Sequence, residues 1–178
     1  MASTKGGMAE KAEIVVGADG FGADLKDAVV AHLVEKGHSV TDLGTDTYYQ
    51  TAADVARRVQ GHDSVKGMLF CGTGMGVGII ANKFSKVSAA TCENVAAARA
   101  SRSINDSNVL ALGGLVTSPA DARSIVDAWL EQEHGKPPVA EGETPPDWWT
   151  SDVEAFLEAK WPDIEKIEAD SRSESESS

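Results

Sequence analysis

The sequence predicts an α/β protein: a three-layer, doubly wound parallel sheet of five strands, followed by a C-terminal helical extension. Two observations support this fold class. Between residues 13 and 133, five short apolar segments alternate with five segments of helical periodicity, which is the pattern of a parallel sheet covered by helices. The apolar segments are also continuous, as expected for strands buried on both faces. For five strands we expect the flavodoxin-like order 2-1-3-4-5.

Each strand is expected to lead into one helix. The strands are expected at Glu13–Gly17, Ser39–Leu43, Gly67–Cys71, Val87–Thr91 and Asn108–Leu112. The helices are expected at Asp24–Lys36, Thr51–Gln60, from the loop after Cys71 to Phe84, at Val95–Ser103, and from Pro119 to Glu133. The dipeptide Ser118-Pro119 is a favourable helix start, because serine caps the helix and proline suits its first position.

The chain changes character after Gly135, where two Pro-Pro pairs appear. We therefore divide it into a flexible N-terminus (1–11), an α/β domain (12–135), a Pro- and Trp-rich linker and helix (136–168), and a disordered acidic tail (169–178) in which serine and glutamate alternate. The segment Ser151–Glu154 is interpreted as a capping box that starts a helix ending near Lys160. The tryptophans of this extension are expected to pack on the domain or on a second subunit.

Composition excludes several classes of function. The net charge is −12, and residues 141–178 contribute 12 acidic and 3 basic side chains to it. Without a basic patch, direct nucleic-acid binding is not expected. No apolar run is long enough to span a membrane, and the N-terminus lacks the features of a signal or transit peptide, so we expect a cytoplasmic protein. Two cysteines, Cys71 and Cys92, are too few for a disulfide framework and are expected as thiols.

The strongest functional signal is the stretch from Gly67 to Lys83. An apolar strand ends at Cys71, and four glycines then alternate with other residues. Such a loop exposes backbone N–H groups at the start of a helix, which suits a phosphate or an oxyanion, and would favour the thiolate of Cys71. The alternative is a structural turn beside a buried cysteine. The spacing matches neither G-x-G-x-x-G nor the P-loop, so dinucleotide and nucleoside triphosphate binding are weak interpretations.

The expected strand order places a second functional group, the carboxylate of Asp19, beside the glycine loop. In the expected order the winding reverses between the first and third strands, and ligands bind at that point, beyond the carboxyl ends of the strands. Asp19 follows the first strand and Cys71 ends the third. We therefore expect a carboxylate, a thiol and a glycine loop in one crevice.

The segment CGTGMGVGIIANK, residues 71–83, resembles the ribose-5-phosphate isomerase B family of sugar-phosphate isomerases. The resemblance covers roughly residues 13–133, including Gly17–Asp19, Asp42–Gly44 and Ala100–Gly113. Within the family, the chain is most similar to a eukaryotic branch, some of whose plant members are labelled DNA-damage toleration proteins.

The resemblance implies a homodimer that interconverts an aldose phosphate and a ketose phosphate through a cis-enediolate, without metal or cofactor. Cys71 matches the catalytic base of the family and Thr73 the residue that assists it. Asp19 and Asn105 match residues that hold sugar hydroxyls. The family's cradle for the developing oxyanion is matched here by the backbone N–H groups of Gly72, Gly74, Met75 and Gly76.

The sequence also departs from the family pattern. Gly20 and Ile104 stand where the isomerases usually have histidines. The phosphate-binding arginines that the family has beyond the last helix have no match here, and Lys136 is the only nearby base. Isoleucine can neither donate nor accept a proton. Three hypotheses follow: an isomerase acting on ribose 5-phosphate weakly or on another sugar phosphate, a sugar-phosphate or small-anion binding protein without turnover, and an interaction module that acts through the C-terminal extension.

Overall fold

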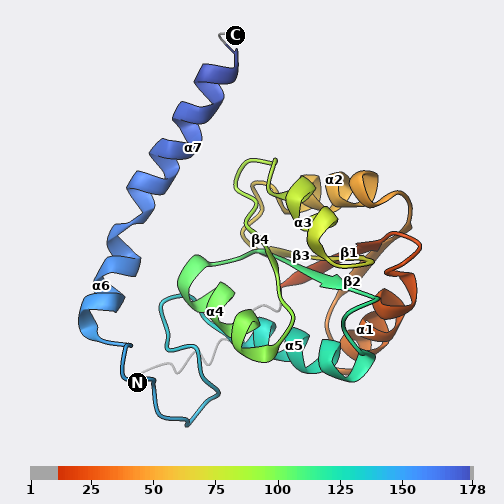
Figure 1. Cartoon of the computed structure of the whole chain (residues 1–178), viewed down its shortest axis with the longest axis horizontal. Coiled ribbons are helices and arrows are strands. Elements are labelled where there is room, and N and C mark those ends of the chain that lie inside the picture. Colours follow the sequence, from red (N-terminus) through yellow and green to blue (C-terminus); the bar gives the residue numbers. More distant parts are fainter. Residues whose placement is uncertain (1–11, 177–178) are drawn as a thin grey trace, which may run out of the picture.

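The computed structural model describes residues 12–176 of the 178-residue chain, apart from the side chains of residues 172 and 174–176. The N-terminal segment that we expected to be flexible, residues 1–11, lies outside this range. One parallel five-stranded sheet is covered by helices on both faces (Figure 1). The predicted α/β class and the C-terminal helical extension are therefore confirmed.

Strands and helices alternate as predicted, with boundaries that differ by a few residues. The strands are β1 (Glu13–Ala18), β2 (Val40–Thr45), β3 (Val65–Cys71), β4 (Ala89–Thr91) and β5 (Val109–Gly113). The helices of the domain are α1 (Ala23–Glu35), α2 (Tyr48–Val59), α3 (Met75–Ala81), α4 (Val95–Asn105) and α5 (Pro119–Glu131), and those of the extension are α6 (Ser151–Ala159) and α7 (Trp161–Glu176).

The strand order is β2-β1-β3-β5-β4, so the expected order was wrong for the last two strands. All five residues of β5 are buried, and this strand pairs with both β3 and β4. In contrast, β4 has only three residues, two of them half-buried and the last exposed. A short strand of small residues suits the edge of a sheet, where it offers few unpaired backbone groups. The reversal between β1 and β3, which positions the candidate site, is as expected.

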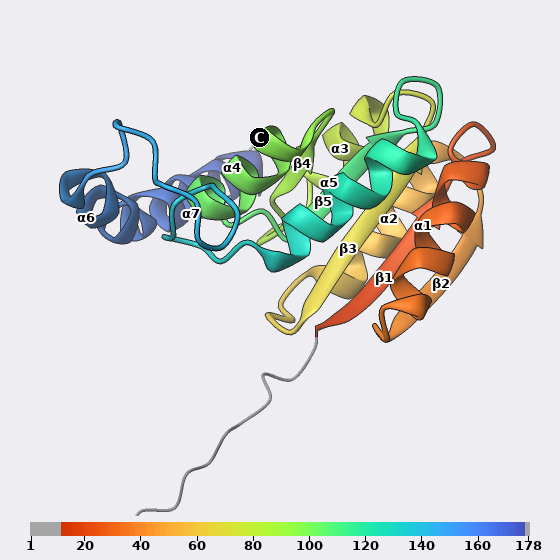
Figure 2. The ribbon, with the colours of Figure 1, turned by 90° about the horizontal axis from the view of Figure 1, so that it is seen from below.

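The core consists of two apolar clusters, one on each face of the sheet. Side chains of α1, α4 and α5 pack on one face, and those of α2 and α3 on the other. Figure 2 shows α1 and α5 in front of the sheet and α2 behind it. The largest fully buried side chain is Trp129, whose Nε1–H donates to Ser107 Oγ at 2.8 Å. Helices thus pack on both faces of the sheet and hold its carboxyl edge in a fixed position.

The end of one helix and the start of another differ from the predictions for local reasons. Helix α3 stops at Ala81 rather than Phe84, because the Asn82 side chain bonds both the N–H and the carbonyl of Ala89, at 2.7 and 2.9 Å. The cap of α6 is Thr150, so the predicted capping box was shifted by one residue. The expected partner in that box, Glu154, instead accepts the Nε1–H of Trp149 at 2.8 Å.

The extension lies beside α4, on the β4 side of the sheet (Figures 1 and 2). Trp149 and Leu157 are buried, and the ring of Trp161 packs edge-on against His134 with centroids 5.3 Å apart. Helix α7 continues through Glu176, where we expected disorder from residue 169 onward. Glutamate is a good helix former, which offsets the serines between the glutamates. Among residues 12–176, no helix has the length and apolar character needed to cross a membrane.

Candidate active site

Asp19 and Cys71 lie next to each other at the carboxyl edge of the sheet, as the topology predicts. Ala18 of β1 pairs with Phe70 of β3, so the residues that follow them are neighbours. The Asp19 N–H donates to the Phe70 carbonyl at 2.9 Å and extends this pairing by one residue. Oδ1 of Asp19 accepts the N–H groups of Phe21 and Gly22, at 2.9 and 3.0 Å. The carboxylate therefore shapes the turn into α1.

The thiol of Cys71 is buried and receives a backbone donor from the glycine loop. The Gly74 N–H points at Cys71 Sγ, 3.1 Å away. Gly74 has φ +77°, a left-handed conformation that side chains rarely adopt, and this conformation turns its N–H toward the sulfur. The exposed Thr73 accepts the Met75 N–H on its Oγ1 at 3.4 Å. The thiolate is the form of cysteine that acts as a base or nucleophile.

The rear wall of the site is built from main chain, because three loops interleave where only glycine fits. A Cβ on Gly22 would lie 2.4 Å from the carbonyl carbon of Phe70. A Cβ on Gly113 would lie 2.5 Å from the carbonyl carbon of Thr73, and one on Gly114 would lie 2.3 Å from the Phe21 oxygen. The loops after β1, β3 and β5 are thus locked together, and we call these contacts the main-chain wall.

The rim of the site carries exposed apolar side chains, of which sequence reasoning singled out only Met75, and that for its backbone N–H group. Phe21 and Leu115 flank Gly72, and Tyr48 lies against Gly76. Phe21 and Leu115 are 70% and 69% exposed, and Met75 is 54% exposed. Their positions, in or beside the connections nearest the reversal of winding, are the sequence signal that could have identified them. Clustered apolar side chains at a surface are typical of binding sites and interfaces.

The connections at this edge of the sheet contain no lysine, arginine or histidine. They are residues 19–22, 46–47, 72–74, 92–94 and 114–118. Their ionisable side chains other than cysteine are the carboxylates of Asp19, Asp46 and Glu93. The nearby Lys26, in the first turn of α1, is buried and bonds Asp42 at 2.5 Å. A single chain therefore offers an incoming anion backbone donors but no lysine, arginine or histidine from these loops.

Asn105 does not join the other predicted residues within one chain. It is the last residue of α4, which starts after the carboxyl end of β4 and runs back to the opposite edge of the sheet. Its neighbour Asp106 lines a small cavity with Lys66, at the start of β3, whereas Cys71 ends that strand. In a parallel sheet every crossover helix returns to the amino edge, so this separation is a consequence of the fold.

Cys92 belongs to a different part of the core. It packs in the cluster on the α1, α4 and α5 face, whereas Cys71 packs in the cluster on the α2 and α3 face. Burial raises the pKa of the Cys92 thiol, against a weaker opposing effect of the Ser101 hydroxyl 3.8 Å away. Both cysteines are free thiols, and Cys92 is a core residue.

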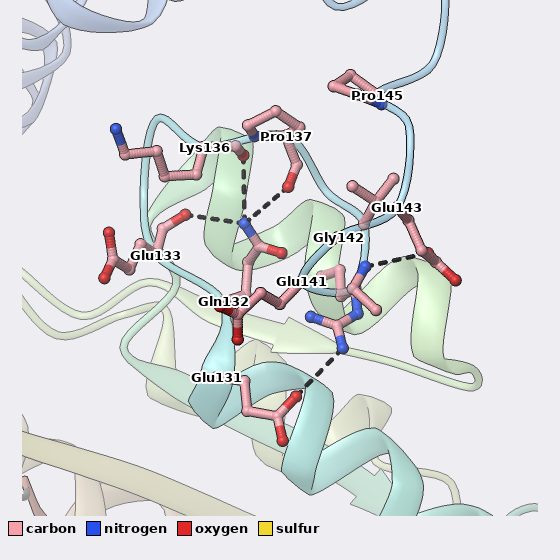
Figure 3. Close-up of a pocket in the computed structure, with 12 residues that line it drawn as sticks. Glu131, Gln132, Glu133, Lys136, Pro137, Glu141, Gly142, Glu143 and Pro145 are labelled. Carbon is pink, nitrogen blue, oxygen red and sulfur yellow. Dashed lines mark hydrogen bonds and ion pairs between the residues drawn. The ribbon is translucent and has the colours of Figure 1, made fainter.

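A cavity of about 560 Å³ lies away from this site, between α4, the end of α5 and the following loop (Figure 3). Gln132 fixes the loop by donating from Nε2 to the carbonyls of Glu133, Lys136 and Pro137 at 3.0–3.2 Å. Arg99 pairs with Glu131 at 3.2 Å. Within the described residues, no group of three or more His, Cys, Asp or Glu side chains is placed to hold a metal ion.

Comparison with known proteins gives the family. Residues 14–140 match the family model described as Ribose/Galactose Isomerase. The chain belongs to this family. Ribose-5-phosphate isomerase B of Escherichia coli is 43% identical over 127 residues, which cover 68% of this chain and 85% of that family member. The structure of ribose-5-phosphate isomerase B from Clostridium thermocellum matches with a TM-score of 0.69 at 34% identity, over 87% of this chain and 98% of the other.

The similarity to a plant member of the family extends beyond residue 140. A DNA damage-repair/toleration protein of Arabidopsis thaliana is 42% identical over 169 residues, or 94% of this chain. This chain spans only 54% of that plant protein. The expected relation to the plant-type branch is confirmed, and a match of this length includes α6 and at least part of α7.

Proposed function

We propose that this protein is a sugar-phosphate aldose–ketose isomerase of the ribose 5-phosphate/ribulose 5-phosphate type, with Cys71 as the base. The observation that carries the proposal is the Gly74 N–H on Cys71 Sγ at 3.1 Å, beside the carboxylate of Asp19. Membership of the ribose/galactose isomerase family supports the same reaction class.

In the proposed reaction, the Cys71 thiolate removes the proton from the carbon beside the substrate carbonyl. The electron pair of that C–H bond forms the C=C bond of an enediolate, and the carbonyl oxygen takes the negative charge. The N–H groups of Gly74 and Met75 already serve the thiol and Thr73, so we assign the oxyanion to the N–H groups of Gly72 and Gly76. The hydroxyl proton of the deprotonated carbon then passes to the charged oxygen, and the new carbonyl forms on that carbon. The thiol returns its proton to the former carbonyl carbon, and Thr73 holds the thiol in place between the two transfers.

We also propose that the active form is a homodimer. The apolar rim of Phe21, Tyr48, Met75 and Leu115 is exposed in the single chain, and a second copy would cover it. Asn105 lies at the opposite edge of its own sheet. A dimer in which the α4 end of one copy reaches the Cys71 site of the other would bring Asn105 to the sugar hydroxyls. Two-fold symmetry would then complete both sites at once.

Proton exchange tests the chemistry. The full chain is incubated with a panel of aldose and ketose phosphates in deuterated water, alongside Cys71→Ala and the matched control Cys92→Ala. We expect deuterium at the carbon beside the carbonyl, together with the isomeric product, in the wild type and in Cys92→Ala only. Exchange that persists in Cys71→Ala would contradict the assignment of the base.

Mixing two inactive variants tests the shared site. In a heterodimer of Cys71→Ala with Asn105→Ala, one site lacks both side chains and the other has both. Random reassociation of equal amounts should therefore restore about a quarter of the wild-type activity. No recovery would show that Asn105 and Cys71 of one site come from the same chain. An Asn105→Ala protein that is fully active by itself would show that Asn105 has no part in the site.

A second candidate is a binding protein that retains the site without turnover. Ile104 has no acid or base group, and Gly20 has no side chain, at the two positions where the resemblance implies histidines. Stabilisation of the fold by a sugar phosphate, with no exchange for any member of the panel, would favour this candidate.

A further inference from the structure

Among the described residues, the loops around Cys71 supply no lysine, arginine or histidine side chain to a substrate phosphate. A sugar phosphate brings a dianion, and proteins bind such groups with charged donors as well as backbone N–H groups. The five connections at the carboxyl edge contain carboxylates but no lysine, arginine or histidine. Lys26, in the adjoining first turn of α1, is engaged by Asp42 at 2.5 Å and by Asp27 at 3.0 Å.

In the proposed dimer, a cation can arrive with the end of α4. Arg102 is already engaged there, because its guanidinium bonds the Asp106 carboxylate and the Ser107 carbonyl and lies 5.6 Å from the centre of the Trp129 ring. His134 is also close, but burial lowers its pKa, so it is neutral at pH 7. Lys66 and Lys86 line the small cavity beside Asp106, and burial lowers the pKa of Lys66. Lys160, from the extension, instead contacts the helix itself through the Ile104 carbonyl.

Lys160 is held at this position by specific contacts. Its Nζ donates to the carbonyl of Ile104, the residue directly before Asn105. The ammonium lies 5.0 Å from the centre of the Trp161 ring, and Trp161 is itself packed on His134. An ammonium has three N–H donors, so the bond to the Ile104 carbonyl orients Lys160 and leaves donors for a phosphate. Burial lowers the pKa of Lys160, and an arriving phosphate would favour the charged form again.

We propose that Lys160 binds the substrate phosphate in the Cys71 site of a second copy of the chain. The inference rests on the proposed isomerase function and its homodimer. It gives the C-terminal extension a role in the site: the extension carries a cation to the helix end that also bears Asn105. A lysine at the last turn of a helix also stabilises that helix, and the test must separate the two roles.

The first test measures phosphate affinity directly, so it does not depend on turnover. Inorganic phosphate is titrated into the full chain and into Lys160→Met, Lys160→Arg and the matched control Lys166→Met, an exposed lysine on α7. We expect Lys160→Met to bind phosphate about 10- to 100-fold more weakly, as expected for a lost charge-assisted hydrogen bond. Lys160→Arg should retain most of the affinity and Lys166→Met all of it.

Isomerase kinetics then distinguish binding from stability. Lys160→Met should raise KM for the sugar phosphate by a similar factor while kcat changes far less. A purely structural lysine would lower the melting temperature and leave KM and phosphate affinity unchanged. That result, or a wild type that does not bind phosphate, would overturn the inference. Phosphate binding that depends on Lys160 without any isomerisation would instead contradict the proposed function alone.

A mixed dimer tests whether Lys160 acts on the other copy. Lys160→Met is combined with Cys71→Ala, and the heterodimer is isolated by two different tags. Its one functional thiol lies in the Lys160→Met chain, and the intact Lys160 lies in the other chain. We expect this site to show the wild-type KM. A KM equal to that of the Lys160→Met homodimer would place Lys160 in its own chain's site and refute the proposal.

Discussion

Replacing Gly22 by alanine tests the main-chain wall. The new Cβ would lie 2.4 Å from the Phe70 carbonyl carbon and 2.6 Å from the Cys71 nitrogen, whereas ordinary contacts begin at 3.4 Å. These atoms belong to the central strand β3 and cannot rotate away. The loop before α1 would therefore have to move by about 1 Å, as overpacked sites do by shifting their backbone.

The magnitude follows from what this movement breaks. Overpacking costs about 1–3 kcal/mol. The two N–H bonds to Asp19 Oδ1 would weaken, at about 1 kcal/mol for each bond lost. We expect a loss of about 3 kcal/mol in the free energy of unfolding, which corresponds to a fall of about 6–12 °C in Tm for a chain of this size.

Gly20→Ala is the matched control, two residues away in the same turn. A Cβ there meets nothing within 4 Å, and the backbone is not left-handed. This variant should be neutral or about 0.5 kcal/mol more stable, because alanine restricts the unfolded chain. Thermal and urea unfolding of the two variants provide the measurement. A Gly22→Ala protein within about 0.5 kcal/mol of Gly20→Ala would refute the description of the wall as close-packed backbone.

Two further predictions concern ionisable groups. Cys71 should alkylate at least about tenfold faster than Cys92 at pH 7.5, because burial raises the pKa of Cys92; equal, slow labelling by mass spectrometry would leave Cys71 as a core residue. Burial alone would raise the pKa of Asp127, but its bonds to Lys36 (2.7 Å) and His32 (2.8 Å) outweigh this and hold the pKa below its ordinary value of 3.8. This carboxylate therefore stabilises the fold above about pH 3.8, and the contribution is lost as the pH falls through the lowered pKa. Urea unfolding should find Asp127→Asn less stable than wild type at pH 7, with the difference shrinking below pH 4; a difference independent of pH would argue against this role.

The fold was largely predictable because its signals are local. Continuous apolar runs marked the strands, and the Ser118 hydroxyl does accept the Asp121 N–H at 3.2 Å, as a helix cap should. The order of β4 and β5 was not predictable in this way. It depends on which strand is buried on both faces in the finished sheet, and a run such as Ala89–Thr91 does not specify its neighbour.

The neighbouring groups at the centre of the candidate site were predictable, but the main-chain wall and the position of Asn105 were not. The neighbouring positions of Asp19 and Cys71 follow from topology alone. Glycine at Gly22 and Gly114 has no signal in its own segment, because the atoms that exclude a Cβ belong to other loops. The placement of Asn105 was missed because motif matching ignores the direction in which α4 runs.

The main-chain wall has a consequence for how this protein can evolve. Its shape depends on positions where a side chain must be absent, so selection on a few glycines preserves the surroundings of the thiol. The rim residues Phe21 and Leu115 project from the same loops and Tyr48 from the start of α2, and their exposed side chains are not part of that wall. A new substrate preference can therefore arise by rim substitutions alone, while the reacting groups keep their geometry.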